Sequence, residues 1–126
     1  MKQTVLTVDD ASTMRKMISV TLRGAGYDVM EASDGMEAAA ILKTTVVDLI
    51  VSDINMPRMN GIDLTRQVRS GGINKSTPIL LLTTESSPEM KNQGREAGAT
   101  AWIVKPFQPD QLAGVVGQVL SRTKRL

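Results

Sequence analysis

Five short apolar segments recur along the chain, and each is followed by a stretch with helical periodicity. The apolar segments cover residues 4–8, 28–32, 48–52, 78–82 and 101–104. Runs this short, rich in Val, Ile and Leu, are typical of strands buried on both faces. Strands that alternate with helices favour a parallel sheet with helices on both sides. The pattern therefore predicts an α/β fold built from five strand–helix units.

The stretches between the apolar segments carry the signals of helix ends. Asp34 and Glu37 are spaced as a capping box, and Ser87 before a proline is typical of a helix start. A further helix is predicted over residues 61–70, and Gly98 is a fitting C-terminal stop. Two apolar stripes at helical spacing predict the first and last helices: Met14, Met17, Ile18, Leu22 and Ala25, ending near Gly24 and Gly26, and Leu112, Val115, Val116, Val119 and Leu120.

Composition limits the domain organisation and the kinds of site. The chain has 126 residues, the size of one ordinary domain, and shows no linker or repeat. We therefore predict a single domain over residues 1–126 with no separate output domain. There is no Cys, which excludes disulfides and thiolate metal sites. There is also no His, so the chain has no histidine metal ligand and cannot present a phosphohistidine of its own.

The charge pattern gives no sign of a nucleic-acid or membrane surface. The net charge is +2, and basic residues gather only in the tail, at Arg122, Lys124 and Arg125, where cations suit a helix end. With one Trp, one Tyr and one Phe, the chain has no aromatic platform for bases, so we predict no nucleic-acid binding. We see no signal peptide and no apolar run of membrane-spanning length. We expect a cytoplasmic protein without membrane insertion.

Charged or hydroxyl-bearing residues follow four of the five predicted strands. Asp9 and Asp10 follow the first, Asp53 the third, Thr83 the fourth and Lys105 the fifth. Each of them alone would be an ordinary cap, turn or solvated residue. However, right-handed crossovers bring the carboxyl ends of parallel strands to one edge of the sheet. Taken together, these residues predict one polar cluster at that edge.

Three carboxylates at one edge favour a bound cation, because like charges close together repel. Oxygen ligands with no His or Cys suit Mg²⁺, which keeps waters and binds phosphate oxygens. We predict Asp10 and Asp53 as direct ligands, Asp9 as a ligand through water, and the backbone carbonyl of Asn55 as a further ligand. Asp53 is also the best nucleophile, since a carboxylate that attacks phosphorus forms an acyl phosphate.

Two more residues fit the chemistry of phosphoryl transfer. Together with the metal, Lys105 would neutralise charge on the phosphoryl oxygens, and Thr83 would donate its hydroxyl to one of them. The bond from Lys105 to Pro106 is an X-Pro bond, in which the cis form costs only about 1 kcal/mol or less. A cis bond here would aim the lysine side chain.

Other folds with the same alternation are disfavoured by their loops. A flavodoxin needs an uncharged, Ser/Thr-rich loop after the first strand, where this chain has Asp9 and Asp10. A dinucleotide-binding fold needs G-x-G-x-x-G there, and the chain has no such motif. Phosphatases of the haloacid-dehalogenase type place a second Asp two residues after the nucleophile, but Asn55 occupies that position after Asp53.

Several motifs lie in order over nearly the whole chain: 8–15 (VDDASTMR), 52–57 (SDINMP), 60–61 (NG), 82–85 (LTTE), and 97–99 (AGA) running on to 105–107 (KPF). With these motifs the chain resembles the receiver domains of two-component signalling, and among them the CheY-like chemotaxis response regulators. The resemblance implies a flavodoxin-like, doubly wound (βα)5 sheet with strand order 2-1-3-4-5, the order known for this family. It also implies that residues 1–126 form one receiver domain.

The resemblance assigns roles to individual residues. It implies that Asp53 is the phosphoacceptor and that Mg²⁺ is held by Asp9, Asp10, Asp53 and the Asn55 carbonyl. Thr83 and Lys105 would contact the phosphoryl group, while Asn55 and Glu85 would tune how long it survives. The donor would be a phosphohistidine on a histidine kinase. The chain would be no enzyme beyond self-phosphorylation from a donor with Mg²⁺ and slow self-dephosphorylation.

Trp102 occupies the position of the family's switch aromatic. The resemblance implies that phosphorylation draws the Thr83 hydroxyl inward and that the Trp102 ring then rotates from outside to inside. The surface formed by the last two helices and the strand between them would then change shape, and a partner would bind to it. Three glycines inside these two helices each weaken a helix by about 1 kcal/mol relative to Ala: Gly94, Gly114 and Gly117.

Three functions remain open at this point. The leading hypothesis is a monomeric receiver that is phosphorylated by a chemotaxis kinase, binds a flagellar motor switch protein, and is a possible substrate of a phosphatase. The second is a receiver that drains phosphoryl groups or serves another pathway, such as pili or development. The third is a true phosphatase for small molecules, but neither a substrate pocket nor a general acid is visible in the sequence.

Overall fold

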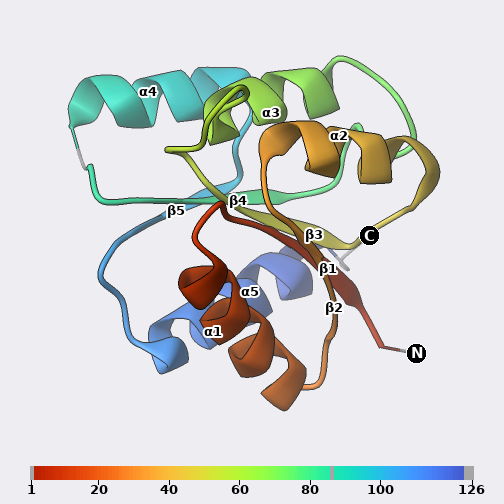
Figure 1. Cartoon of the computed structure of the whole chain (residues 1–126), viewed down its shortest axis with the longest axis vertical. Helices are drawn as coiled ribbons and strands as arrows, with labels where there is room; N and C mark the ends of the chain where they lie inside the picture. The colour runs from red at the N-terminus through yellow and green to blue at the C-terminus, as the bar shows by residue number, and fades with distance from the viewer. Residues whose placement is uncertain (1, 86, 124–126) are drawn as a thin grey trace.

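A computed structural model describes residues 2–85 and 87–123, which fold into one parallel sheet between two layers of helices. The sheet order is β2-β1-β3-β4-β5, and every pair is parallel, as predicted. Helices α1 and α5 cover one face, while α2, α3 and α4 cover the other (Figure 1). The elements are β1 Thr4–Val8, α1 Ser12–Gly24, β2 Asp28–Ala32, α2 Gly35–Thr44, β3 Leu49–Asp53, α3 Gly61–Arg69, β4 Ile79–Thr83, α4 Pro88–Ala97, β5 Ala101–Val104 and α5 Pro109–Thr123.

The two faces of the sheet carry separate apolar clusters. Successive side chains of a strand point to opposite faces, so in β3 Leu49 and Val51 join the cluster under α1 and α5, while Ile50 joins the other. All five residues of β3 are buried, and the same holds for β4. Burial on both faces explains why these strands read as continuous apolar runs in the sequence.

Two strands begin and end one residue later than predicted. The predicted segment 48–52 is observed as Leu49–Asp53, and 78–82 is observed as Ile79–Thr83. Pro78 has no N–H to donate to the ladder, which favours a start at the next residue. At the other end, Asp53 pairs with Leu82. Asp53 and Thr83 are thus the last residues of their strands and not the first residues of loops.

Most predicted helix ends are confirmed. The Ser87 side chain accepts a hydrogen bond from Met90 N, and Gly98 closes α4 in the left-handed conformation. The predicted helix 61–70 ends at Arg69, with Ser70 as its C-cap. The first helix ends at Gly24, so the expectation that Ala25 continues its apolar stripe was wrong, because Ala25 is an exposed cap.

The capping box of α2 differs in one contact. Asp34 Oδ1 accepts from Glu37 N at 2.8 Å, as predicted, but Glu37 Oε1 accepts from Ser33 N and not from Asp34 N. At the end of the chain, Arg122 is exposed in the last turn of α5, whereas Lys124 and Arg125 lie outside the described residues. None of the described helices is both long enough and apolar enough to cross a bilayer.

Candidate functional site

Three carboxylates meet where β1 and β3 end. Asp9 and Asp10 come directly after β1, and Asp53 is the last residue of β3. One carboxylate oxygen from each lies within 4.8 Å of the others. Asp9 and Asp53 are buried, whereas Asp10 is exposed. The cluster predicted from the sequence is therefore present at the carboxyl edge of the sheet.

Lys105 brings the positive charge of this site. Its Nζ lies 3.1 Å from Asp53 Oδ1 and 3.4 Å from Asp9 Oδ2, and only 13% of its side chain is exposed. The backbone positions it directly after β5, where Lys105 N donates to Thr83 O at 2.7 Å. The bond from Lys105 to Pro106 is cis, as anticipated.

Local hydrogen bonds hold the turn after β1. Ala11 N donates to Asp9 Oδ1 at 2.9 Å, which leaves Oδ2 facing Lys105. Arg15 Nη1 donates to the Asp9 carbonyl at 2.7 Å, and Arg15 Nε is 3.1 Å from Glu31. Arg15 was not singled out by sequence reasoning as a site residue. The position of Arg15 in the motif 8–15 was the only sequence signal for a role in the site. Its contact with Asp9 depends on the direction of α1 relative to β1.

Asp53 lies in surroundings that oppose its negative charge. Burial raises the pKa of its carboxyl above the usual 3.8, and nearby Asp9 raises it further. Lys105 and the backbone N–H of Asn55 lower the pKa but do not cancel the effect of burial. The backbone of Gly61 packs so closely that a Cβ there would lie 2.4 Å from the Asp53 carbonyl oxygen. A glycine is required at position 61 for this reason.

The other predicted site residues surround this centre at different depths. Thr83 is buried at the end of β4, next to the strand position that pairs with Asp53. Its Oγ1 accepts from Glu85 N at 3.1 Å, and the Glu85 side chain itself is exposed. Asn55 is exposed two residues after Asp53. The geometry of the Thr83 hydroxyl therefore already links it to the backbone of Glu85.

Trp102 is half-buried on β5 and packs against the apolar cluster under α2, α3 and α4. A Cβ on Gly94 of α4 would lie 3.0 Å from its ring. The buried indole Nε1 has no hydrogen-bond partner among the described residues. A pocket of about 210 Å³ opens beside the ring, lined by Lys91, Arg95, Ala99, Thr100, Ala101 and Trp102.

The donor set of the acid cluster fits a divalent cation. All three side chains offer carboxylate oxygens, the ligands that hard cations prefer. Three carboxylates face one ammonium group, so two negative charges are left without a partner in this cluster. A divalent ion would compensate both charges and would offset the repulsion from Asp9 that, in addition to burial, raises the pKa of Asp53.

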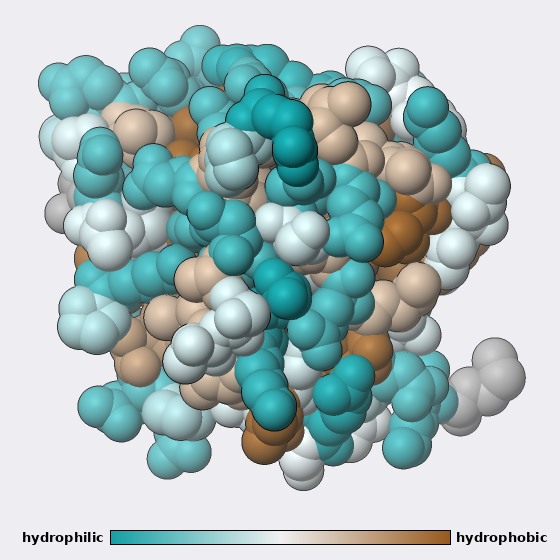
Figure 2. Space-filling model, in the orientation of Figure 1, coloured by the Kyte–Doolittle hydropathy of each residue, from teal (hydrophilic) through white to brown (hydrophobic). Residues whose placement is uncertain are grey.

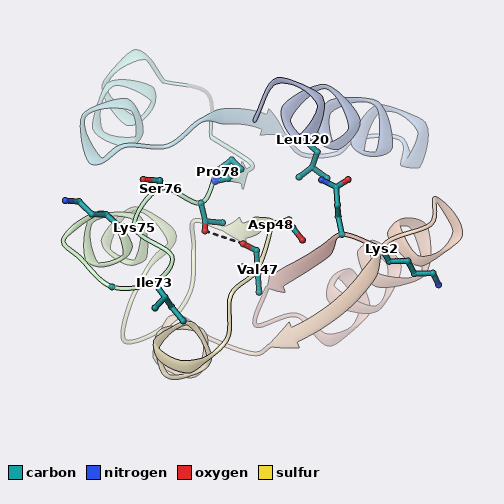
Figure 3. Close-up of a pocket in the computed structure, with 11 residues that line it drawn as sticks. Lys2, Val47, Asp48, Ile73, Lys75, Ser76, Pro78 and Leu120 are labelled. Atoms are coloured by element: carbon teal, nitrogen blue, oxygen red, sulfur yellow. Dashed lines mark hydrogen bonds between the residues drawn. The ribbon is translucent and has the colours of Figure 1, made fainter. Parts of the chain in front are cut away.

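A second hollow of about 560 Å³ lies at the opposite edge of the sheet, where Asp48 precedes β3 and Leu120 of α5 closes one side (Figure 3). Lys2 and Lys75 line it, but their side chains point outward and away from each other (Figure 3). The face of the molecule seen in Figure 1 is largely hydrophilic, with small scattered apolar groups among the described residues (Figure 2). Convergent charged side chains are found at the carboxyl edge and not in this hollow.

Known proteins are similar to this chain in fold and in sequence. Residues 5–116 match the family model described as response regulator receiver domain. The chemotaxis protein CheY1 of Helicobacter pylori is 44% identical over 86% of this chain and 89% of its own length. The phosphate regulon transcriptional regulatory protein PhoB of Pseudomonas aeruginosa is 38% identical over 96% of this chain, which spans only 53% of PhoB.

Two solved structures extend the comparison. The chemotaxis response regulator CheY4 of Vibrio cholerae superposes with a TM-score of 0.90 and 47% identity, covering 94% of this chain and 99% of CheY4. The receiver domain of the sensor histidine kinase PA1611 from Pseudomonas aeruginosa has a TM-score of 0.88 and 26% identity, over 96% of this chain and 99% of that domain. That structure is described with a magnesium ion coordinated in the active site cleft.

Proposed function

The chain belongs to the response regulator receiver domain family, and from this premise we propose that it accepts a phosphoryl group on Asp53 and then binds a partner protein. A receiver domain takes part in two-component signalling, which implies a histidine kinase as its partner. The family does not consist of conventional enzymes. The observation that carries the proposal is the contact of Lys105 Nζ with both Asp53 and Asp9.

The proposed reaction is a transfer from nitrogen to oxygen. A carboxylate oxygen of Asp53 attacks the phosphorus of a phosphohistidine, the new O–P bond forms, and the P–N bond breaks. The bonding electron pair goes to the imidazole nitrogen of the donor, which takes up a proton from solvent. Lys105 stabilises negative charge on the phosphoryl oxygens, and the Thr83 hydroxyl donates to one of them after leaving the Glu85 N–H.

We assign the metal site to the same cluster. Asp10 and Asp53 would hold Mg²⁺ directly, Asp9 would act through water, and the Asn55 backbone carbonyl would complete the protein ligands. The magnesium ion described in the PA1611 receiver domain supports this choice of metal. Bound Mg²⁺ supplies positive charge that offsets the charge of the transferring phosphoryl oxygens. We propose that Asn55 and Glu85, whose side chains are both exposed, affect the approach of water to the acyl phosphate.

The pathway we favour is chemotaxis, with a flagellar motor switch protein as the target. The similarity to CheY proteins over most of their length supports it. The pocket beside Trp102, with Lys91 and Arg95 at its rim, offers a place for an acidic partner segment. We propose that Thr83 and Trp102 change together on phosphorylation and alter this pocket. A receiver that drains phosphoryl groups or serves pili or development would share the site and differ only in its partner.

Phosphorylation is tested with a small donor. The full chain is incubated with acetyl phosphate and Mg²⁺ and analysed by intact-mass spectrometry. We expect one added phosphoryl group on the parent chain and none on Asp53→Asn. The control is Asp28→Asn, which removes an exposed carboxylate at the opposite edge of the sheet. A parent chain that stays unmodified, or an Asp53→Asn variant that is modified equally, contradicts the proposal.

The pathway is tested with the activated protein as bait. Beryllofluoride with Mg²⁺ mimics the phosphoryl group, and the protein is passed through a lysate of its host with Asp53→Asn as control. Capture of a flagellar switch protein by the activated parent alone supports chemotaxis. Capture of a different protein under the same condition assigns the receiver to another pathway.

A further inference from the structure

Arg58 has an unusual backbone conformation in the loop that follows Asp53. Its φ is 66°, the only positive φ at a non-glycine residue in the described part of the chain. The left-handed region is unfavourable for a side chain such as Arg, and it persists where surrounding contacts compensate. Arg58 belongs to the segment between β3 and α3, residues 54–60, which we name the acceptor loop.

The compensating contact is an ion pair with Asp34. Arg58 Nη2 donates to Asp34 Oδ2, although 67% of the Arg58 side chain is exposed. Only 10% of the Asp34 side chain is exposed, so its carboxylate is held in place. The other oxygen of Asp34, Oδ1, accepts from Glu37 N and caps α2. A single carboxylate thus joins the start of α2 to the acceptor loop.

A backbone contact supports the same junction. A Cβ on Gly35 would lie 2.6 Å from the Met59 carbonyl oxygen and 2.9 Å from Met59 Cβ. Glycine at position 35 therefore allows the first turn of α2 to touch the residue after Arg58. We name the Asp34–Arg58 pair and the Gly35–Met59 contact together the α2 latch.

The acceptor loop is also fastened at the site itself. Ile54 N donates to Leu82 O at 2.9 Å, and Gly61 N donates to Ile54 O at 3.0 Å. These bonds hold both ends of the loop next to Asp53. Between them lies Asn55, the proposed carbonyl ligand, two residues after Asp53. The Met56 side chain is buried in the apolar cluster under α2, α3 and α4, and the α2 latch adds a polar and a backbone contact from the middle of the loop to the start of α2.

From this geometry we propose that Asp34 and Arg58 are positioning residues, which hold the acceptor loop so that Asn55 and Asp53 are arranged to bind the divalent ion. The inference rests on the proposed function, because it concerns the metal site assigned above. Groups that orient metal ligands without touching the metal raise affinity by reducing the reorganisation needed on binding. Neither residue would contact the ion or the phosphoryl group.

The chemistry of Asp34 allows the two roles of its side chain to be separated. Asn is as good an N-cap as Asp, so Asp34→Asn keeps the acceptor for Glu37 N. The second atom of the amide is a donor, however, and cannot accept from the Arg58 guanidinium. Asp34→Asn therefore breaks the ion pair while it leaves the cap of α2 in place.

Replacement of Arg58 separates positioning from stability. Arg58→Gly removes the stabilising ion pair but also relieves the strain of a side chain at positive φ, so we expect little net change in thermal stability. A residue that served only stability would give no change in metal affinity in such a variant. Arg58→Lys keeps a positive charge that can reach Asp34 and should restore most of the affinity.

The experiment is a calorimetric titration of the full chain with Mg²⁺ alone. We expect Asp34→Asn and Arg58→Gly each to raise the Kd for Mg²⁺ by about two- to fivefold, the range for one partly exposed ion pair. The matched control is Asp63→Asn, which removes the same charge and breaks an exposed pair with Arg66 on the outside of α3. The control should bind Mg²⁺ as the parent does.

The outcomes separate the two proposals. If the parent chain neither binds Mg²⁺ nor accepts a phosphoryl group, the proposed function fails and the latch fails with it. If the parent binds Mg²⁺ but Asp34→Asn and Arg58→Gly match Asp63→Asn, only the positioning role is overturned. Weaker binding in both variants, with rescue by Arg58→Lys, supports it.

Discussion

The ammonium nitrogen of Lys105 lies 3.1 Å from Oδ1 of Asp53, with the first residue coming directly after β5 and the second ending β3. The strand β4 lies between these two strands, and all run parallel. Because their carboxyl ends share an edge, two residues distant in sequence form one ion pair. The same contact leaves Asp53 between a favourable cation and an unfavourable buried setting.

Removing the charge of Asp53 should stabilise the metal-free protein. Asp53→Asn takes away a buried carboxylate next to Asp9, while Lys105 keeps Asp9 as its partner. We expect the free energy of unfolding at neutral pH, measured by urea denaturation with EDTA, to rise by about 1–2 kcal/mol. A variant less stable than the parent under these conditions would show that the Asp53–Lys105 attraction outweighs burial.

Magnesium should stabilise the parent chain through the acid cluster. A ligand that binds only the folded state at a hundred times its Kd adds about 2.7 kcal/mol. We expect the Tm to rise with Mg²⁺. The rise should be mostly lost in Asp10→Asn, because Asp10 is a proposed direct ligand of the ion. Asp10 is the exposed member of the cluster, so this variant leaves the buried carboxylates in place. Asp28→Asn, at the far edge, serves as the control and should retain the full response.

Trp102 should report the activation of the site. As the single Trp of the chain, it gives an emission signal that comes from one position. We expect beryllofluoride with Mg²⁺ to change this emission, because the ring packs in the cluster that adjoins α4. Asp53→Asn should abolish the change. An unaltered spectrum in a sample with proven mimic binding would remove Trp102 from the switch.

Gly94→Ala should disturb the packing of the Trp102 ring more than it stabilises α4 through helix propensity. In an open helix position Gly→Ala gains roughly 0.5–1 kcal/mol, and we expect this gain for Gly114→Ala, where a Cβ meets nothing within 4 Å. At Gly94 a Cβ would lie 3.0 Å from the indole ring and 3.3 Å from Leu81. Gly94→Ala should therefore gain less or lose stability, and it should shift Trp102 emission, which Gly114→Ala leaves unchanged.

The acid sensitivity of the fold should include a contribution from Asp34. The Glu37 N–H and the Arg58 side chain hold the pKa of Asp34 below its usual 3.8. The folded state therefore binds a proton less readily than the unfolded state, so this stabilisation is present above pH 3.8 and is lost as the pH falls through the folded pKa. We expect the difference in unfolding free energy between the parent and Asp34→Asn to shrink below pH 3.8. A difference that stays constant with pH would contradict this origin.

The carboxylate cluster could be predicted from the sequence, because it depends only on the order of the residues and on the alternation of strands and helices. Asp9 and Asp10 after one apolar run and Asp53 at the end of another had to meet once the strands were parallel and the crossovers right-handed. The exact ends of β3 and β4 were harder to predict. Both strands are buried at every residue, so a shift of the strand by one residue leaves the same apolar pattern in the sequence. Their ends were decided by pairing, such as that of Asp53 with Leu82.

The periodicity, the caps and the strand-end residues in the sequence were enough to predict the α/β class and the meeting of Asp9, Asp10, Asp53 and Lys105 at one edge of the sheet. Only the tertiary structure decided the contacts between loops: Arg15 on the Asp9 carbonyl, Gly61 against Asp53, and Arg58 on Asp34. The physical reason is that alternation and capping are local properties of a chain. The approach of one loop to another depends on how the helices pack on the sheet, and no local pattern encodes that distance.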